Sequence, residues 1–198
     1  MEKFSNCSSK ILVLPWKDID TDMIIPAQYL TSVASSGFGD YLFRRFRESD
    51  PDFIFNRVTG KSHSILLAGA NFGCGSSREH AVWALRDFGI RVVIAPSFSD
   101  IFTNNAFKNG LLLIQITPPQ YEHLREKSAQ DPEIILKADL KAQTICTSDW
   151  STSFSISPFR KRCLLEGVDD LGYLLEKAPL IAEYRKANPL YVRANQPA

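Results

Sequence analysis

The sequence lacks several features that would assign a function class at once. No apolar run approaches the roughly 18 residues of a membrane-spanning helix, and residues 1–6 do not form the basic-then-apolar start of a signal peptide. The net charge is only +1, from 23 Lys+Arg against 22 Asp+Glu, so no basic excess indicates nucleic-acid binding. We therefore expect a cytoplasmic protein with no membrane segment and no nucleic-acid partner.

Metal-binding patterns are also missing. The four cysteines are too far apart for a C-x-x-C pair: Cys7, Cys74, Cys146 and Cys163. The three histidines are scattered too, and no H-E-x-x-H helix occurs. Without a secretion signal, a disulfide framework is not expected either. The sequence thus predicts that this chain alone holds no metal ion or iron–sulfur cluster.

The sequence does contain a clear α/β pattern in its middle third. Short apolar runs at 64–69, 91–95 and 111–116 are typical of buried strands, and they alternate with helical patterns at 77–88 and 98–108. This βαβαβ order predicts parallel strands with right-handed connections. At 198 residues, the chain is long enough for one domain with its own core.

The flanking regions add elements to this core. An early strand is predicted at 10–14, a helix from Ala27 and another over 38–47. The last third predicts helices and alternating strands, in the order 118–129, 133–136, 143–147, 152–156, 158–167 and 180–186. We expect one α/β domain over 1–198, with a parallel βαβαβ core, added antiparallel strands and a C-terminal tail from about residue 188.

Segment 69–81 carries the strongest chemical signal. It places a tight turn between a buried strand and a helix, at the sheet edge where α/β proteins bind ligands. Gly73 and Gly75 allow the backbone to approach a ligand closely. Arg78 offers a planar fork suited to a carboxylate, and Ser76 and Ser77 add two hydroxyls. The segment therefore predicts an anion-binding corner that can also handle a proton.

A structural interpretation competes with this one. The spacing from Ser76 to Glu79 fits a helix capping box, which is the more frequent meaning of such a pattern. A cap explains neither Ser77 nor Arg78 nor the two glycines. A dinucleotide fingerprint is incomplete because Arg78 occupies its third glycine position, and no P-loop motif is present. A nucleotide site is therefore disfavoured.

Residues 71–81, Asn-Phe-Gly-Cys-Gly-Ser-Ser-Arg-Glu-His-Ala, resemble the signature of the small subunit of 3-isopropylmalate dehydratase. That family is the separate-chain counterpart of the aconitase swivelling domain. Further blocks agree in register: the D-T-D-x-I-I-P element at 20–26, 92–102 with 109–112, and 159–172. The resemblance covers nearly the whole chain and implies a swivelling β/β/α domain.

The resemblance also implies a reaction and which of two subunits carries each catalytic group. The reaction is the isomerisation of 2- and 3-isopropylmalate by dehydration and rehydration, in leucine biosynthesis. The [4Fe–4S] cluster is expected on a large partner subunit, and none on this chain. Ser76 is implied as the general base. The implied contacts to the dicarboxylate substrate are Ser77, Arg78, Asp22 and Gly75.

A substrate-recognition loop is implied at Thr31, Ser32, Val33, Ala34, Ser35 and Ser36. The family often carries a basic residue here, where this chain has Ser35. A related diacid such as citraconate or 2-methylmalate is therefore an alternative substrate, unless the partner supplies the missing charge.

Several residues have competing interpretations. For Cys74 we favour a small buried residue over a cluster ligand, and for His80 a structural role over a catalytic one. For Asp22, a turn-forming role like that of Asp20 and a role in the site are equally supported. A non-catalytic anion-binding module is disfavoured by the intact triplet at 76–78. An RNA-binding role is disfavoured by the neutral charge.

Overall fold

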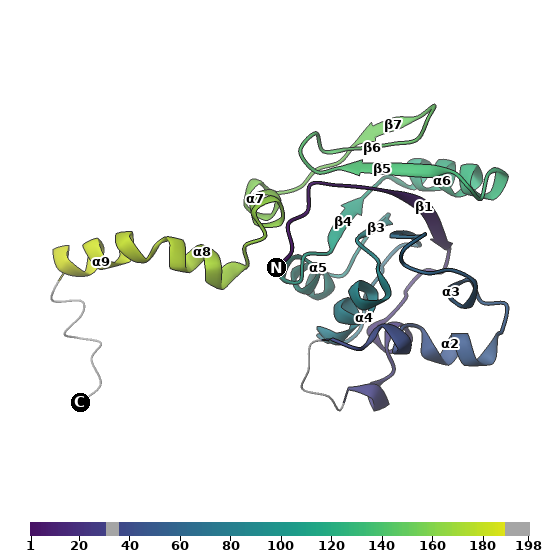
Figure 1. Cartoon of the computed structure of the whole chain (residues 1–198), viewed down its shortest axis with the longest axis horizontal. Helices are drawn as coiled ribbons and strands as arrows, with labels where there is room; N and C mark the ends of the chain where they lie inside the picture. Colours follow the sequence, from purple (N-terminus) through teal and green to yellow (C-terminus); the bar gives the residue numbers. More distant parts are fainter. Residues whose placement is uncertain (31–35, 189–198) are drawn as a thin grey trace.

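The computed structural model describes residues 1–30 and 36–188. Its centre is a seven-stranded mixed sheet in the order β4-β3-β2-β1-β5-β6-β7 (Figure 1). The strands are β1 (Asn6–Leu14), β2 (Ile65–Ala68), β3 (Val92–Ala95), β4 (Leu112–Gln115), β5 (Ile135–Asp139), β6 (Thr144–Cys146) and β7 (Ser151–Ser153). The predicted α/β class is confirmed.

The parallel half of the sheet holds the predicted βαβαβ unit. Strands β1 to β4 pair in parallel, and helices α4 (His80–Phe88) and α5 (Asp100–Lys108) connect β2 to β3 and β3 to β4. All four residues of β2 and of β3 are buried, as expected for strands covered on both faces. The carboxyl ends of these strands therefore share one edge of the sheet.

The antiparallel half is added to the other side of β1. Strand β5 pairs with β1, β6 with β5, and β7 with β6, all antiparallel, and Figure 1 shows this group beside β1. Helix α6 (Pro118–Gln130) connects β4 to β5. The added antiparallel strands are thus confirmed. Strand β1 begins four residues earlier than predicted, because its first residues pair with β5.

Two apolar cores cover the two faces of the sheet. Along β2, Leu66 and Ala68 belong to the core shared with α4 and α5. Ile65 and Leu67 belong to the other core, which includes Leu124 of α6 and residues of α7 (Pro158–Glu166). This alternation is the period-2 pattern of a strand. Because both faces of the sheet are packed, the loops that follow the parallel strands extend from well-buried strand ends.

The region before β2 contains more and shorter helices than the sequence predicted. Its elements are α1 (Thr21–Ile24), η1 (Ala27–Tyr29), η2 (Gly39–Tyr41), α2 (Arg44–Ser49) and α3 (Ile54–Arg57). The single helix predicted over 38–47 is wrong, because Phe43 adopts a left-handed conformation with φ 49°. Its ring is fully buried against Phe53 and Phe55. Packing thus overrides local helix propensity here.

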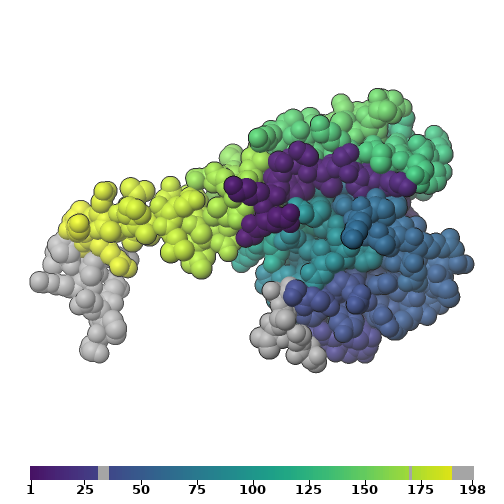
Figure 2. Space-filling view, viewed as in Figure 1, coloured from purple at the N-terminus to yellow at the C-terminus, as the bar shows by residue number. Residues whose placement is uncertain are grey.

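The C-terminal part forms an arm that the sequence only partly predicted. Helix α7 ends at Gly167 as expected, and α9 (Ala178–Ala187) is longer than predicted. Helix α8 (Asp170–Glu176) was not predicted. Figures 1 and 2 show α8 and α9 projecting from the body. The tail expected from about residue 188 lies almost entirely outside the described residues. Among the helices described, none has the length and apolar character needed to span a membrane.

Candidate functional site

The loops that follow β1, β2 and β3 are joined by backbone hydrogen bonds at the carboxyl edge of the sheet. The Gly73 N–H donates to the Ile19 carbonyl at 2.7 Å, and the Thr21 N–H donates to the Cys74 carbonyl at 3.0 Å. On the other side, the Phe72 N–H donates to the Ser97 carbonyl at 3.1 Å. The glycine loop predicted from the sequence therefore lies between two neighbouring loops, which hold its backbone in place.

Gly73 is required by close packing. Its φ is +76°, and a Cβ there would lie 2.2 Å from the ring of Phe102, a core residue at 1% exposure. Gly75 has φ +90°, but a Cβ there would meet nothing closer than 3.4 Å. Gly73 therefore needs both the conformation and the space of a glycine, whereas Gly75 needs only the conformation.

This difference predicts two distinct stability losses. Gly73→Ala should lower the free energy of unfolding by about 2–4 kcal/mol, from left-handed strain plus overpacking. Gly75→Ala, the matched control, should cost only about 1–2 kcal/mol from strain alone. Urea unfolding of both variants and the wild type measures the difference. Equal losses would show that Phe102 does not constrain the loop.

The capping-box interpretation of Ser76 and Glu79 is wrong. Helix α4 begins at His80, three residues later than predicted, and its N-cap Glu79 makes no side-chain capping bond. Glu79 instead accepts a hydrogen bond from Asn109 Nδ2 at 2.6 Å. The Ser76 carbonyl accepts from the Arg78 N–H at 2.9 Å, which continues the loop. The Ser76 hydroxyl is therefore not used to cap this helix.

The Ser76 side chain lies next to Thr21, a residue that sequence reasoning missed. Ser76 is exposed, whereas Thr21 is buried at 2% exposure. Thr21 Oγ1 donates to the Ser76 carbonyl at 3.3 Å and lies 3.5 Å from Ser76 Oγ. Since a threonine hydroxyl has one hydrogen, that donation leaves Thr21 Oγ1 as an acceptor for the Ser76 O–H. The only sequence signal for Thr21 is its central place in the D-T-D element.

Arg78 and Asp22 form an ion pair across 56 positions of the sequence. Their side chains are 24% and 48% exposed, so the guanidinium is only partly shielded from water. Asp20 has a different role, because its carboxylate caps α1 by accepting from the Met23 N–H at 2.7 Å. Asp22 was expected either to form the turn or to belong to the site. In the structure Asp20 shapes the turn, and Asp22 contacts Arg78.

The remaining predicted site residues lie around this pair. Gly75 and Ser77 are exposed, and the Ser77 carbonyl accepts from Asn105 Nδ2 of α5 at 3.3 Å. Ser36 is exposed. The other five residues of the predicted recognition loop lie outside the described residues: Thr31, Ser32, Val33, Ala34 and Ser35. The structure therefore brings Ser76, Arg78 and Asp22 together on one exposed surface.

Comparison with known proteins decides the family. The Aconitase C-terminal domain model matches residues 1–119. The 3-isopropylmalate dehydratase small subunit of Francisella tularensis subsp. novicida is 48% identical over 187 residues, covering 94% of this chain and 98% of the relative. That of Xanthobacter autotrophicus is 49% identical over 193 residues, covering 94% and 96%. The chain belongs to the family of 3-isopropylmalate dehydratase small subunits.

A solved structure agrees with this assignment. The 3-isopropylmalate dehydratase (leuD) of Methanocaldococcus jannaschii superposes with a TM-score of 0.68 at 26% identity, covering 90% of this chain and 99% of that one. The family predicted from residues 71–81 is therefore confirmed. The roles of individual residues in this dehydratase small subunit stay predictions, which the geometry above supports.

The described residues of the small subunit offer no set of ligands for an iron–sulfur cluster. Its four cysteines lie on separate elements: on β1, in the glycine loop, on β6 and on α7. Within residues 1–30 and 36–188, no group of three or more His, Cys, Asp or Glu side chains could hold a metal ion. Desolvation raises the pKa of the Cys74 thiol, and the carboxylates of Asp20 and Asp18 raise it further. Cys74, which is half-buried rather than buried, therefore stays a neutral thiol.

His80 packs as an aromatic residue. Its ring lies 5.2 Å from that of Phe38 and 4.6 Å from that of Trp83, which agrees with the structural role predicted for it. Two short basic segments, at 44–47 and 160–162, are used in surface contacts. Arg44 pairs with Glu48, and Arg162 with Glu166.

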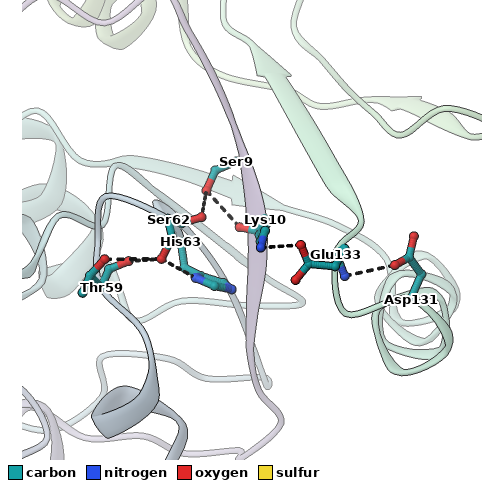
Figure 3. Close-up of polar contacts among 7 residues, drawn as sticks. All are labelled: Ser9, Lys10, Thr59, Ser62, His63, Asp131 and Glu133. Atoms are coloured by element: carbon teal, nitrogen blue, oxygen red, sulfur yellow. Dashed lines mark hydrogen bonds and ion pairs between the residues drawn. The ribbon is translucent and has the colours of Figure 1, made fainter.

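A serine–histidine contact lies at the end of β2 opposite the glycine loop (Figure 3). Ser62 Oγ lies 2.9 Å from His63 Nδ1, and the Ser62 carbonyl accepts from Ser9 Oγ at 3.2 Å. Burial lowers the pKa of His63, and the nearby Lys10 ammonium lowers it further. These contacts tie the turn before β2 to β1, so Ser62 serves as a control for Ser76.

Proposed function

We propose that this chain supplies the proton-transfer base and the carboxylate-binding groups of a two-chain 3-isopropylmalate dehydratase. The complex would interconvert 2- and 3-isopropylmalate by dehydration and rehydration, in cytoplasmic leucine biosynthesis. The observation that carries this is the meeting of Ser76 with the Asp22–Arg78 pair on one surface in a chain of this family. The whole chain would act as one swivelling domain.

Arg78 is suited to bind one substrate carboxylate. Its guanidinium carries five N–H donors in a rigid fork, and Nη1 is the atom that contacts Asp22. Asp22 thus orients the side chain while other donors stay available. Gly75 and Ser77 flank Ser76 on the same loop and would add backbone and hydroxyl donors to the carboxylates.

Ser76 is placed to act on the carbon-bound proton. In dehydration, the Ser76 alkoxide takes the proton from one carbon, the electron pair of that bond forms the double bond, and hydroxide leaves the adjacent carbon. Rehydration reverses these steps with the hydroxyl on the other carbon. The Ser76 alkoxide needs positive potential nearby, which Arg78 provides. A [4Fe–4S] cluster on the large subunit would supply the Lewis acidity for hydroxide departure.

The exposure of the site supports a need for a partner. Gly75, Ser76 and Ser77 are all exposed in the single chain, whereas proton abstraction from carbon benefits from exclusion of water. We infer that the large subunit covers this surface and completes the cavity around the substrate.

Reconstitution tests the proposal. The chain is co-expressed anaerobically with the cluster-bearing large subunit, and 3-isopropylmalate and citraconate are assayed separately. We expect a stable complex that turns over 3-isopropylmalate. If only citraconate is turned over, the smaller diacid is the substrate. This alternative is tested because Ser35 stands where the family often carries a basic residue. A failure to form a complex, or to act on either diacid, would contradict the proposal and favour a non-catalytic module.

A further inference from the structure

The hydroxyl of Thr21 is held in a fixed place beside the proposed base. Thr21 is the first residue of α1 and is buried at 2% exposure. Its N–H donates to the Cys74 carbonyl at 3.0 Å, and its own carbonyl accepts from the Ile25 N–H at 3.0 Å. Because the backbone is bonded on both sides and a β-branched side chain is stiff at χ1, the position of Thr21 Oγ1 is set within the chain itself.

Two oxygens of Ser76 share the single hydrogen of this hydroxyl. Thr21 Oγ1 lies 3.3 Å from the Ser76 carbonyl oxygen and 3.5 Å from Ser76 Oγ. Both distances exceed the range of about 2.5–3.0 Å that is usual for an O–H···O hydrogen bond. Within residues 1–30 and 36–188, no other group accepts a hydrogen bond from Thr21 Oγ1. The hydrogen can therefore turn from one Ser76 oxygen to the other by rotation about the C–O bond.

The hydroxyl is not needed to hold the two loops together. Backbone hydrogen bonds already join them, from the Gly73 N–H to the Ile19 carbonyl at 2.7 Å and from the Thr21 N–H to the Cys74 carbonyl at 3.0 Å. Valine, which is also β-branched, would fill the same buried space without a hydroxyl. A buried hydroxyl whose contacts are both long costs free energy. Chemistry at Ser76 therefore explains this hydroxyl better than loop pairing does.

Ionisation of Ser76 changes which of its oxygens the Thr21 hydrogen prefers. While Ser76 is neutral, its carbonyl accepts that hydrogen, and its own O–H can point at Thr21 Oγ1. As an alkoxide, Ser76 Oγ carries the negative charge and becomes the stronger acceptor, because a charge-assisted hydrogen bond is shorter and roughly twice as strong as a neutral one. The Ser76 side chain is exposed, so it can move toward the fixed Thr21 hydroxyl and shorten the contact.

We propose that Thr21 is a positioning residue for Ser76, whose hydroxyl turns from the Ser76 carbonyl to the Ser76 alkoxide and stabilises it as the base. This inference rests on the proposed function, because it requires Ser76 to be the base. The Arg78 guanidinium supplies positive potential but is engaged by Asp22, whereas Thr21 supplies a direct donor that needs little reorganisation. The proton taken from carbon resides on Ser76 and returns from it, and Thr21 keeps its own hydrogen throughout.

The test uses the full chain reconstituted with the cluster-bearing large subunit. Thr21→Val removes the hydroxyl and keeps the branched shape, whereas Thr21→Ser keeps the hydroxyl. Thr103→Val is the matched control, because the Thr103 hydroxyl donates to the Ser99 carbonyl at 2.8 Å at the start of α5. For each variant, kcat, KM and the pH dependence of kcat/KM are measured with 3-isopropylmalate, and urea unfolding of the chain is followed. If Thr21→Val does not fold, Thr21→Ala is compared with Thr21→Ser, since these two differ by the hydroxyl alone.

We expect Thr21→Val to lower kcat by about ten- to hundredfold, which is the effect of losing one hydrogen bond to a charged group. KM should be unchanged, because the buried Thr21 side chain does not touch the substrate. The rise of kcat/KM with pH should move to higher pH, since Ser76 then loses its proton less readily. Thr21→Ser should recover most of kcat, and Thr103→Val should match the wild type.

A wild-type kcat in Thr21→Val overturns the proposal. So does a Thr21→Ser variant that is no more active than Thr21→Val, or a loss of kcat in Thr21→Val with the pH profile of the wild type, which would show a structural role. Loss of turnover in Ser76→Ala together with normal turnover in Thr21→Val overturns this inference and leaves the proposed function standing. Full activity of Ser76→Ala removes Ser76 as the base, and the proposed function fails with it.

Discussion

Replacing Ser76 with alanine should lower kcat of the reconstituted complex by about 10²–10⁴-fold, the usual contribution of a general base. The change removes the hydroxyl that lies beside Thr21 and that we propose as the base, two residues from Arg78, the proposed carboxylate ligand. Its contact with Thr21 Oγ1 is long, at 3.5 Å, and its side chain is exposed. The free energy of unfolding should therefore change by less than about 0.5 kcal/mol.

Ser62→Ala provides the control for this result. It removes an exposed serine hydroxyl that contacts a histidine, at the opposite end of β2 from Ser76. Its kcat should equal that of the wild type. Near-normal turnover by Ser76→Ala, or a comparable loss in Ser62→Ala, would contradict the assignment of Ser76 as the base.

Replacing Arg78 with lysine should raise KM for the diacid by about tenfold or more while lowering kcat less. Lysine keeps the positive charge but loses the planar fork that binds a carboxylate through two parallel hydrogen bonds. The pair with Asp22 is then replaced by a less directional contact, so the ammonium is also less well oriented.

Arg44→Lys is the matched control, because Arg44 also pairs with a carboxylate, that of Glu48, on the surface of α2. Steady-state kinetics of both variants separates substrate binding from turnover. An unchanged KM for Arg78→Lys would remove Arg78 from the carboxylate site and leave it as a structural partner of Asp22.

The parallel core could be predicted because each local signal agreed with the others. Strand 64–69 is continuously apolar, and helices 77–88 and 98–108 end where glycine or asparagine follows. The break at Phe43 could not be predicted, since it depends on an aromatic cluster with Phe53 and Phe55. Helix α8 was missed although Asp169 caps it by accepting from the Gly172 N–H, because a glycine within the helix lowers its propensity.

The candidate site shows a similar limit. Residues 76–78 were singled out by their spacing and by resemblance, but the start of α4 was misplaced because the Ser76–Glu79 pattern imitates a cap. The meeting of Asp22 with Arg78 depends on the pairing of the loops after β1 and β2, which no local pattern shows. Thr21 was missed for the same reason: its hydroxyl matters only once the two loops lie side by side.

We propose that this chain brings the base to a reaction that neither chain performs alone. The most direct test titrates a fixed amount of cluster-loaded large subunit with this chain and follows the ultraviolet absorbance of the unsaturated diacid formed from 3-isopropylmalate. We predict no activity with either chain alone, and a rise to a plateau with the wild type. Ser76→Ala should compete with the wild type and lower that plateau. Full activity from the large subunit alone, or from its complex with Ser76→Ala, would contradict the account.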